Sequence, residues 1–257
     1  MPRRSSFALL GLLLLASLGL GVGAHRARAA EKVDLLLVLA ADISRSLDEP
    51  KFRLQRDGYA AALVDQRVIR AIASGPNGRI AICFVEWSGP SAQAVIVEWT
   101  LISSADEARH LAARIREAPR RFMERTAIGS AIDFSVKQFE EAPFEASRHV
   151  IDVSGDGTSN AGRSVVEARQ DALARGITIN GLVILTEVPI PYNPTHTHPP
   201  GGLQAYYENN VVGGPGAFVF VAENFESFGS SIASKLIKEI AAGPMLRSPG
   251  QPLRVVR

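Results

Sequence analysis

The sequence feature that most constrains the fold is an apolar run over residues 33–41, in which only Asp34 is polar. A strand with one face in the core and one face in water alternates apolar and polar residues, and this run does not. It therefore predicts a strand that is buried on both faces. Such strands lie at the centre of parallel sheets, whose faces are covered by the helices that connect the strands.

The rest of the chain alternates apolar strands with amphipathic helices. Further strands are expected over residues 79–87, 94–102, 149–153, 177–185 and 217–222. Helices are expected over residues 48–72 in two parts, 104–119, 127–141, 164–175 and 225–240. The short link over residues 88–91 predicts an antiparallel hairpin. The pattern indicates a Rossmann-like α/β fold: a doubly wound, mostly parallel sheet with one antiparallel edge strand and helices on both faces.

The first 29 residues have the layout of a secretory signal peptide. Arg3 and Arg4 precede an apolar run over residues 7–20, and Ala27 and Ala29 supply small residues for cleavage. We expect cleavage near Ala29, a periplasmic or secreted location, and no stable membrane span in the mature chain. The alternative is an uncleaved membrane anchor, for which the apolar run is short.

Beyond the signal, one domain is expected over residues 30–243, with a flexible tail over residues 244–257. A segment rich in proline and glycine, residues 188–216, interrupts the rhythm of strands and helices, and we name it the excursion. Four of the 28 Lys and Arg residues lie in the signal, which has no Asp or Glu, so 24 basic residues face 26 acidic ones and the net charge becomes −2. The sequence has no stripe of basic residues of the kind that indicates nucleic-acid binding. Cys83 is the only cysteine, which excludes an intrachain disulfide and suggests a core position.

Oxygen-bearing side chains occur at the carboxyl ends of two predicted strands and before one helix. Asp42, Ser44 and Ser46 alternate after the first strand, Thr126 precedes a helix, and Asp156 follows the strand over residues 149–153. Each has an ordinary interpretation as a turn or a helix cap. Ligands of such sheets bind beyond the carboxyl ends of the strands. Together these oxygens therefore predict a site for a hard cation, Mg²⁺, or alternatively Mn²⁺ or Ca²⁺.

This arrangement resembles the von Willebrand factor type A (vWA) domain and its metal-ion-dependent adhesion site (MIDAS). The resemblance rests on Asp42-x-Ser44-x-Ser46, on Thr126, on Asp156-Gly157 and on the order of elements over most of the mature chain. Residues 85–88, 151–157 and 213–218 are further similar to an uncharacterised secreted bacterial subgroup of that family. The excursion departs from most family members.

The resemblance implies a role for each of the five residues. Ser44, Ser46 and Thr126 would bind the metal through their hydroxyls, and Asp42 and Asp156 largely through bound water. Neutral hydroxyls leave much of the metal charge uncompensated, so a further oxygen ligand can enter. The expected function is an exported, monomeric, non-catalytic protein-binding domain that captures an Asp or Glu side chain of a partner protein, whose identity the sequence does not give.

Two other functions stay open at this stage. One is a metal-dependent hydrolase that uses the same ion as a Lewis acid, although the sequence has no recognised catalytic motif and no histidine is expected beside the site. The other is an envelope scaffold with a structural metal. His196 and His198 could bind a transition metal, but without an evident third ligand we expect them in a solvated loop.

Overall fold

The apolar run at residues 33–41 forms the central strand β2 (Leu36–Asp42) of a six-stranded sheet in the computed structural model, which describes residues 30–241. Every residue of β2 is buried, as the absence of alternation predicted. The signal peptide expected at residues 1–29 and the tail expected at 244–257 lie outside the described residues. None of the helices in residues 30–241 combines the length and apolar character that crossing a bilayer demands.

The sheet has the strand order β4-β3-β2-β6-β7-β8. All neighbouring pairs are parallel except β3 with the edge strand β4, which confirms the expected hairpin. The remaining strands are β3 (Ile80–Trp87), β4 (Gln93–Ile102), β6 (His149–Gly155), β7 (Ile177–Ile184) and β8 (Val219–Ala222). The doubly wound α/β class is therefore confirmed.

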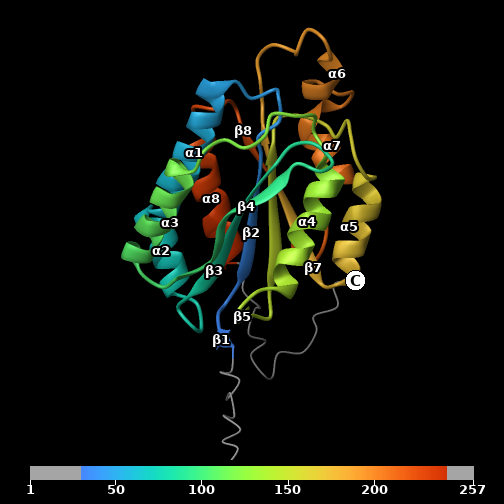
Figure 1. Ribbon diagram of the computed structural model, residues 1–257. Coiled ribbons are helices and arrows are strands. Elements are labelled where there is room, and N and C mark those ends of the chain that lie inside the picture. The colour runs from blue at the N-terminus through green and yellow to red at the C-terminus, as the bar shows by residue number, and fades with distance from the viewer. Residues whose placement is uncertain (1–29, 242–257) are drawn as a thin grey trace, which may run out of the picture.

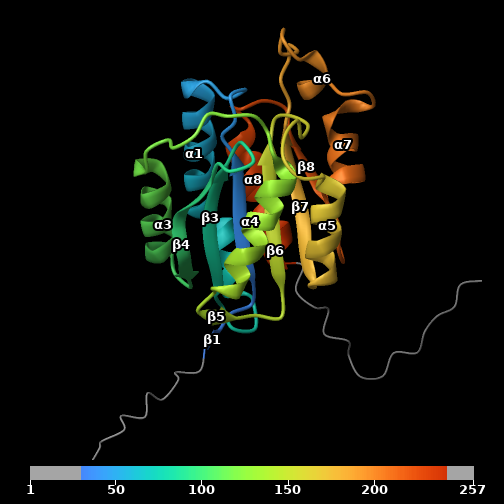
Figure 2. The ribbon, with the colours of Figure 1, turned by 45° about the vertical axis from the view of Figure 1, so that its right-hand side comes forward.

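Helices cover both faces of the sheet (Figures 1 and 2). One face packs against α1 (Glu49–Leu63), α2 (Gln66–Ala73), α3 (Ala105–Glu117) and α8 (Phe228–Ala241). The other face packs against α4 (Ile128–Glu140), α5 (Val165–Ala174) and α7 (Gly202–Asn210). The short α6 (Pro194–Thr197) lies beyond the edge at which β2 and β6 end.

The two cores share strand β2 between them. Leu37 and Leu39 belong to the core under α1 and α8, whereas Val38 and Ala40 belong to the core under α4 and α5. Successive side chains of a strand point to opposite faces, so one continuous apolar run serves both layers. Burial of this apolar surface stabilises the fold by roughly 25 cal/mol per Å².

Several elements differ from expectation, and the central strand and the last helix differ most. The central strand begins at Leu36 rather than at residue 33, because Asp34 instead accepts a hydrogen bond from the Asn77 backbone N–H at 2.8 Å. Before it in the chain lies the short strand β1 (Glu31–Lys32), which pairs in parallel with β5 (Phe144–Glu145). The last helix begins at Phe228 rather than at residue 225, after a turn in which Asn224 Oδ1 accepts from Ser227 N at 2.8 Å.

Candidate metal centre

The five side chains proposed as metal ligands come from three loops at one edge of the sheet. Asp42 ends β2 and is followed by a turn that carries Ser44 and Ser46. Thr126 lies just before α4, and Asp156 directly follows β6. Because β2 and β6 are adjacent and parallel, their carboxyl ends meet, and the three loops converge there (Figure 2).

A continuous chain of hydrogen bonds joins these five residues. The Ser44 backbone N–H donates to Asp42 Oδ1 at 2.7 Å, and the Ser44 and Ser46 hydroxyls are 3.0 Å apart. Ser46 Oγ donates to Asp156 Oδ1 at 2.6 Å, and Thr126 Oγ1 donates to Ser44 Oγ at 3.1 Å. The structure thus brings together the full set of residues that the sequence singled out. It also excludes the N-cap interpretation of Thr126, since the cap of α4 is Ala127.

The two carboxylates of this cluster are buried and incompletely hydrogen-bonded. Burial raises the pKa of Asp42 well above its ordinary value, and the nearby negative charge of Asp156 raises it further. Burial likewise raises the pKa of Asp156. Asp42 Oδ2 and Asp156 Oδ2 have no hydrogen-bond partner. Two unpartnered anionic oxygens beside three hydroxyls fit a divalent cation, which would offset their mutual repulsion.

The donor set is unusual in its low content of charged ligands. No group of three Asp, Glu, His or Cys side chains within residues 30–241 is arranged to hold an ion. The cluster instead combines two carboxylates with the hydroxyls of Ser44, Ser46 and Thr126. Hydroxyl and carboxylate oxygens are hard ligands of the kind that Mg²⁺, Mn²⁺ and Ca²⁺ accept.

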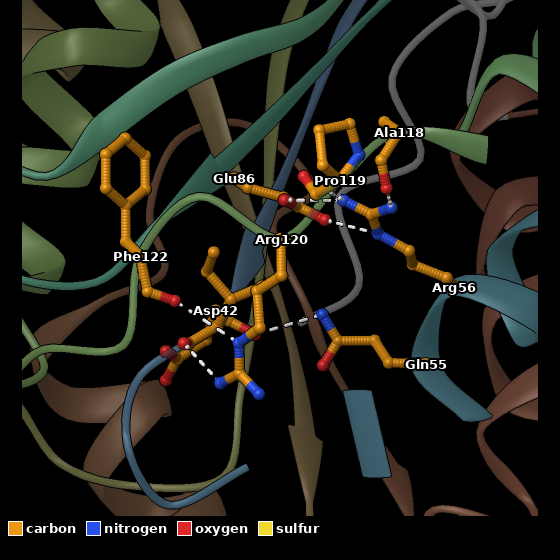
Figure 3. A network of polar contacts seen from close by, with 9 residues as sticks. Asp42, Gln55, Arg56, Glu86, Ala118, Pro119, Arg120 and Phe122 are labelled. Carbon is orange, nitrogen blue, oxygen red and sulfur yellow. Dashed lines mark hydrogen bonds and ion pairs between the residues drawn. The ribbon is translucent and has the colours of Figure 1, made fainter. Parts of the chain in front are cut away.

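Arg120 holds the backbone of the loop that carries Ser44. One of its terminal nitrogens donates to the carbonyl oxygens of Ile43, Ser44 and Leu47 at 2.9, 3.2 and 2.9 Å. Gln55 of α1 donates to the Asp42 carbonyl at 3.0 Å from the other side. Figure 3 shows Arg120 and Gln55 approaching this loop. These contacts hold the backbone from which Ser44 and Ser46 project.

A buried ion pair lies behind the same loop. Arg56 donates through Nε and Nη2 to the two carboxylate oxygens of Glu86, at 2.8 and 2.9 Å (Figure 3). The exposed fractions of the two side chains are 5% and 0%. Burial raises the pKa of Glu86, and the hydrogen bonds and charge of Arg56 lower it. Glu86 thus anchors α1 to the end of β3.

The position of His196 contradicts our expectation that no histidine lies beside the site. Its side chain is buried, and Nε2 is 3.4 Å from Thr126 Oγ1. Burial lowers the pKa of His196, while the charge of Asp156 raises it. The solvated-loop interpretation holds only for His198, which is exposed. The reason is that α6 folds back over the site, and the Thr158 backbone N–H donates to the His196 carbonyl at 2.8 Å.

Two glycines at the end of β6 and just after it make room for the excursion. A Cβ atom at Gly157 would lie 2.2 Å from His196 Nε2, and one at Gly155 would lie 2.5 Å from the Tyr207 hydroxyl. Tyr207 is fully buried and packs in the core under α7. The excursion therefore packs onto the body of the domain through Tyr207.

Three further polar, aromatic or sulfur-bearing side chains lie in the interior. Cys83 is buried in the core under α4, as the sequence predicted, and Trp87 lies in the same core. Asp152 is buried and contacts Lys235 of α8.

A surface hollow of about 250 Å³ opens over the cluster. Among its lining residues, Ser46 and Thr126 belong to the cluster, and Arg45 and Arg125 are exposed basic side chains at its border. The excursion contributes Tyr192, Asn193 and His196, and the loop after β6 contributes Asn160. The hollow therefore gives access to the hydroxyl side of the cluster between basic residues.

Sequence reasoning missed Arg120 and His196. The sequence shows an arginine-rich stretch at residues 120–125, but nothing distinguishes Arg120 from its neighbours. His196 lies in a segment whose path is set by packing rather than by local pattern. The one available signal was Gly157 beside Asp156, which indicates that another group approaches closely there.

Comparison with known proteins places the chain in a family and in a fold. The profile of a family described as a protein of unknown function, DUF1194, matches residues 32–244. No curated protein is similar enough in sequence to count as a match.

Solved structures share the fold at low sequence identity. Proximal thread matrix protein 1 from the mussel byssus has a TM-score of 0.57 and 15% identity, over 82% of this chain and 47% of that one. The pilus adhesin SpaC from Lactobacillus rhamnosus GG has a TM-score of 0.56 and 13% identity, over 83% of this chain and 31% of that one. A von Willebrand factor type A protein from Catenulispora acidiphila has a TM-score of 0.52 and 15% identity, over 81% of this chain and 43% of that one.

The chain spans less than half the length of each of these three proteins, and their likeness concerns the fold. The family match covers most of the chain, and the sheet order and helix layers are those of the Catenulispora domain's class. The chain therefore belongs to the DUF1194 family and has the fold of a von Willebrand factor type A domain.

Proposed function

We propose that this protein is an exported, non-catalytic protein-binding domain that uses a divalent cation to capture an acidic side chain of a partner. One observation carries the proposal: three hydroxyls and two buried carboxylates with unpartnered oxygens converge beneath a hollow. Ser44, Ser46 and Thr126 would hold the ion directly, and Asp42 and Asp156 would compensate its charge, largely through water. Mg²⁺ is the expected ion, with Mn²⁺ and Ca²⁺ as alternatives.

The charges around the hollow suit a carboxylate. A bound divalent cation supplies a strongly electrophilic position, and three of its proposed ligands are neutral. Arg45 and Arg125 add positive charge at the border of the hollow. An Asp or Glu side chain that enters between Arg45 and Arg125 would displace water from the cation and form charge-assisted contacts with it and with the arginines.

Two relatives of the fold support a metal-dependent interaction. One structure of the mussel byssus matrix protein has a zinc-occupied MIDAS, with a TM-score of 0.56 and 16% identity over 82% of this chain. SpaC is a pilus adhesin. We transfer the general idea of metal-assisted binding to this chain, and not the partners of those proteins.

The cellular setting and organisation form part of the same proposal. Residues 1–29 would direct export and be removed near Ala29, leaving a single domain over residues 30–243 and a flexible tail. The mature protein would act as a monomer in the periplasm or outside the cell, with a protein partner rather than a nucleic acid.

A second candidate function is a metal-dependent hydrolase, and one observation on His196 favours it. Its buried imidazole has a lowered pKa and lies next to Thr126, where a general base could act on a metal-bound substrate. Turnover of generic phosphate or ester substrates with Mn²⁺ that disappears in His196→Ala and in Asp156→Ala would favour this candidate. Absence of turnover across such substrates favours the binding domain.

The proposal is tested by metal binding followed by metal-dependent capture. Calorimetric titration of the exported protein with Mg²⁺, Mn²⁺ and Ca²⁺ should show one site, and Asp156→Asn should lack it. At a metal concentration 100 times the dissociation constant, the ion should stabilise the fold by about 2.7 kcal/mol. Envelope proteins retained by the immobilised, metal-loaded protein should elute with chelator.

Two variants serve as controls for this capture. Ser46→Ala should abolish metal-dependent retention, whereas Ser130→Ala, which changes a hydroxyl of α4 outside the cluster, should retain it. Equal capture in chelator and in Mg²⁺ would contradict carboxylate docking. Absence of any metal binding would contradict the proposed function as a whole.

A further inference from the structure

A second buried cluster of reactive side chains lies outside the candidate metal centre, on the face of the sheet that α8 covers. Lys235 of α8 places Nζ 2.6 Å from Asp152 Oδ1 of β6 and 2.5 Å from Glu239 Oε1, one helical turn away. Asn180 of β7 donates to the same Glu239 oxygen at 2.8 Å. An amine, a carboxylic acid and a second acid are therefore in direct contact.

This cluster is buried and unbalanced in charge. Lys235 and Asp152 have no exposed surface, and Glu239 is 1% exposed. One cation faces two carboxylates, so the ionised cluster carries an uncompensated negative charge in the interior, where ions are costly. Burial raises the pKa of Asp152 to about 7, and Glu239 raises it while Lys235 lowers it. A reaction that removes the charges of Lys235 and Asp152 would therefore remove part of this cost.

The contact between Lys235 and Asp152 is close without being an aligned hydrogen bond. Lys235 Nζ lies 2.6 Å from Asp152 Oδ1, which is the distance of an ion pair, yet neither Asp152 oxygen has a hydrogen bond of ordinary geometry. An amine held against a carboxyl group in this way is placed for reaction as well as for charge pairing.

We propose that Lys235 and Asp152 join in an intramolecular isopeptide bond, with Glu239 as the proton shuttle. A proton first passes from the Lys235 ammonium to the Asp152 carboxylate. The neutral Nζ then attacks Asp152 Cγ, and Glu239 accepts the second proton of the nitrogen. Glu239 returns that proton to the departing hydroxyl, so one C–N bond forms, one C–O bond breaks and one water leaves. Glu239 ends as it began, and no oxidant or cofactor takes part.

The fold supplies what such a condensation needs. Reactants fixed in contact reach effective molarities of about 10⁵–10⁸ M, which offsets the tendency of amides to hydrolyse. The product replaces a buried ion pair by a neutral amide and so removes its desolvation cost. Glu239 and Asn180 also line a surface hollow of about 390 Å³, through which the water can leave.

Neighbouring groups hold the shuttle in place. Asn180 donates to Glu239 and its Oδ1 accepts from the Phe218 backbone N–H at 3.1 Å. The Phe218 ring lies 5.4 Å from Lys235 Nζ and shields it. The bond would tie α8 covalently to the centre of the sheet.

Mass spectrometry of the full, folded protein under denaturing conditions tests the proposal directly. The wild-type polypeptide should weigh one water less than its sequence, and trypsin should leave residues 149–163 attached to the peptide that contains Lys235. Lys235→Arg and Asp152→Ala should show the mass of their sequences. Wild-type protein at its sequence mass, with peptide 149–163 released free, would overturn the proposal and leave an ion cluster.

Further variants test the roles assigned to each side chain. Asp152→Asn should reach the same covalent product by losing ammonia instead of water. Glu239→Gln should leave most of the protein uncoupled, and full coupling in that variant would overturn the role of Glu239 as shuttle. Loss of ammonia from the wild type would overturn the assignment to Asp152 and place the bond at Asn180. A mass loss that persists in Lys235→Arg would also overturn the proposal.

Discussion

Ser46 Oγ donates a 2.6 Å hydrogen bond to Asp156 Oδ1 across 110 positions of the sequence. Ser46 is half-buried and Asp156 is buried, so the bond runs from the accessible side of the cluster to its interior. It joins the loop after β2 to the loop after β6 before any ion enters. The candidate ligands are thus held together by their own hydrogen bonds. A cation that binds among them would replace these hydrogen bonds without a large movement of the ligands.

Asp42→Asn should stabilise the metal-free protein at neutral pH, because it removes one of two repelling buried carboxylates. The pKa of Asp42 is raised in the folded state, so the stability linked to this group is present at pH values below its ordinary pKa of 3.8 and is lost as the pH rises through the folded value. Urea unfolding in chelator at a series of pH values above 3.8 should show the unfolding free energy of the variant increasing relative to that of the wild type as the pH rises. A difference in unfolding free energy between variant and wild type that does not change with pH would contradict this account.

Arg120→Ala should weaken metal binding without removing a ligand. Its guanidinium holds three carbonyls of the loop that carries Ser44, and loss of such outer contacts typically costs about 10–100-fold in affinity. Calorimetric titration with Mg²⁺ measures the effect. Arg121→Ala removes the same charge from an exposed neighbour and should leave the affinity within a factor of about 2, the spread expected of context effects at the surface.

Gly157→Ala should destabilise the protein through a collision with His196. The Cβ atom would lie 2.2 Å from Nε2, and overpacking of this kind costs about 1–3 kcal/mol. Gly157 has a negative φ angle, so backbone strain does not contribute. In a His196→Ala background the same change should cost much less, and a double-mutant cycle of unfolding free energies measures the coupling. Additive effects would show that α6 does not rest on Gly157.

Glu86→Gln should lower the free energy of unfolding by about 3–5 kcal/mol, because it leaves the buried Arg56 guanidinium without its counter-charge. Chemical denaturation measures the loss. Glu49→Gln provides the matched control: its pair with Arg53 has exposed fractions of 54% and 74%, and such a pair contributes less than about 1 kcal/mol. Equal losses in the two variants would show that burial does not set the cost.

The sheet was predictable because its signals are local. Residues 33–41 carry no polar alternation, and the hairpin between β3 and β4 follows from a link too short for a crossover. Ser104 likewise marks the start of α3, where its Oγ accepts from the Glu107 backbone N–H at 3.3 Å. Such patterns act over a few residues and survive in any context.

The placement of His196 and Arg120 beside the site was not predictable, because it depends on long-range packing. His196 reaches Thr126 only after the excursion has crossed the edge of the sheet and α7 has buried Tyr207. No local pattern encodes that path. Arg120 is a similar case, since its three acceptors are backbone carbonyls of a loop more than 70 residues earlier in the chain.

The crossover between β2 and β6 also makes the cluster a reporter of folding. Its members extend from Asp42 to Asp156, so a chain cut before residue 156 lacks one of them, however well its earlier helices form. The proposed metal affinity would therefore develop only when the centre of the sheet has closed. A metal titration followed during refolding would time that closure, and it would do so independently of any partner.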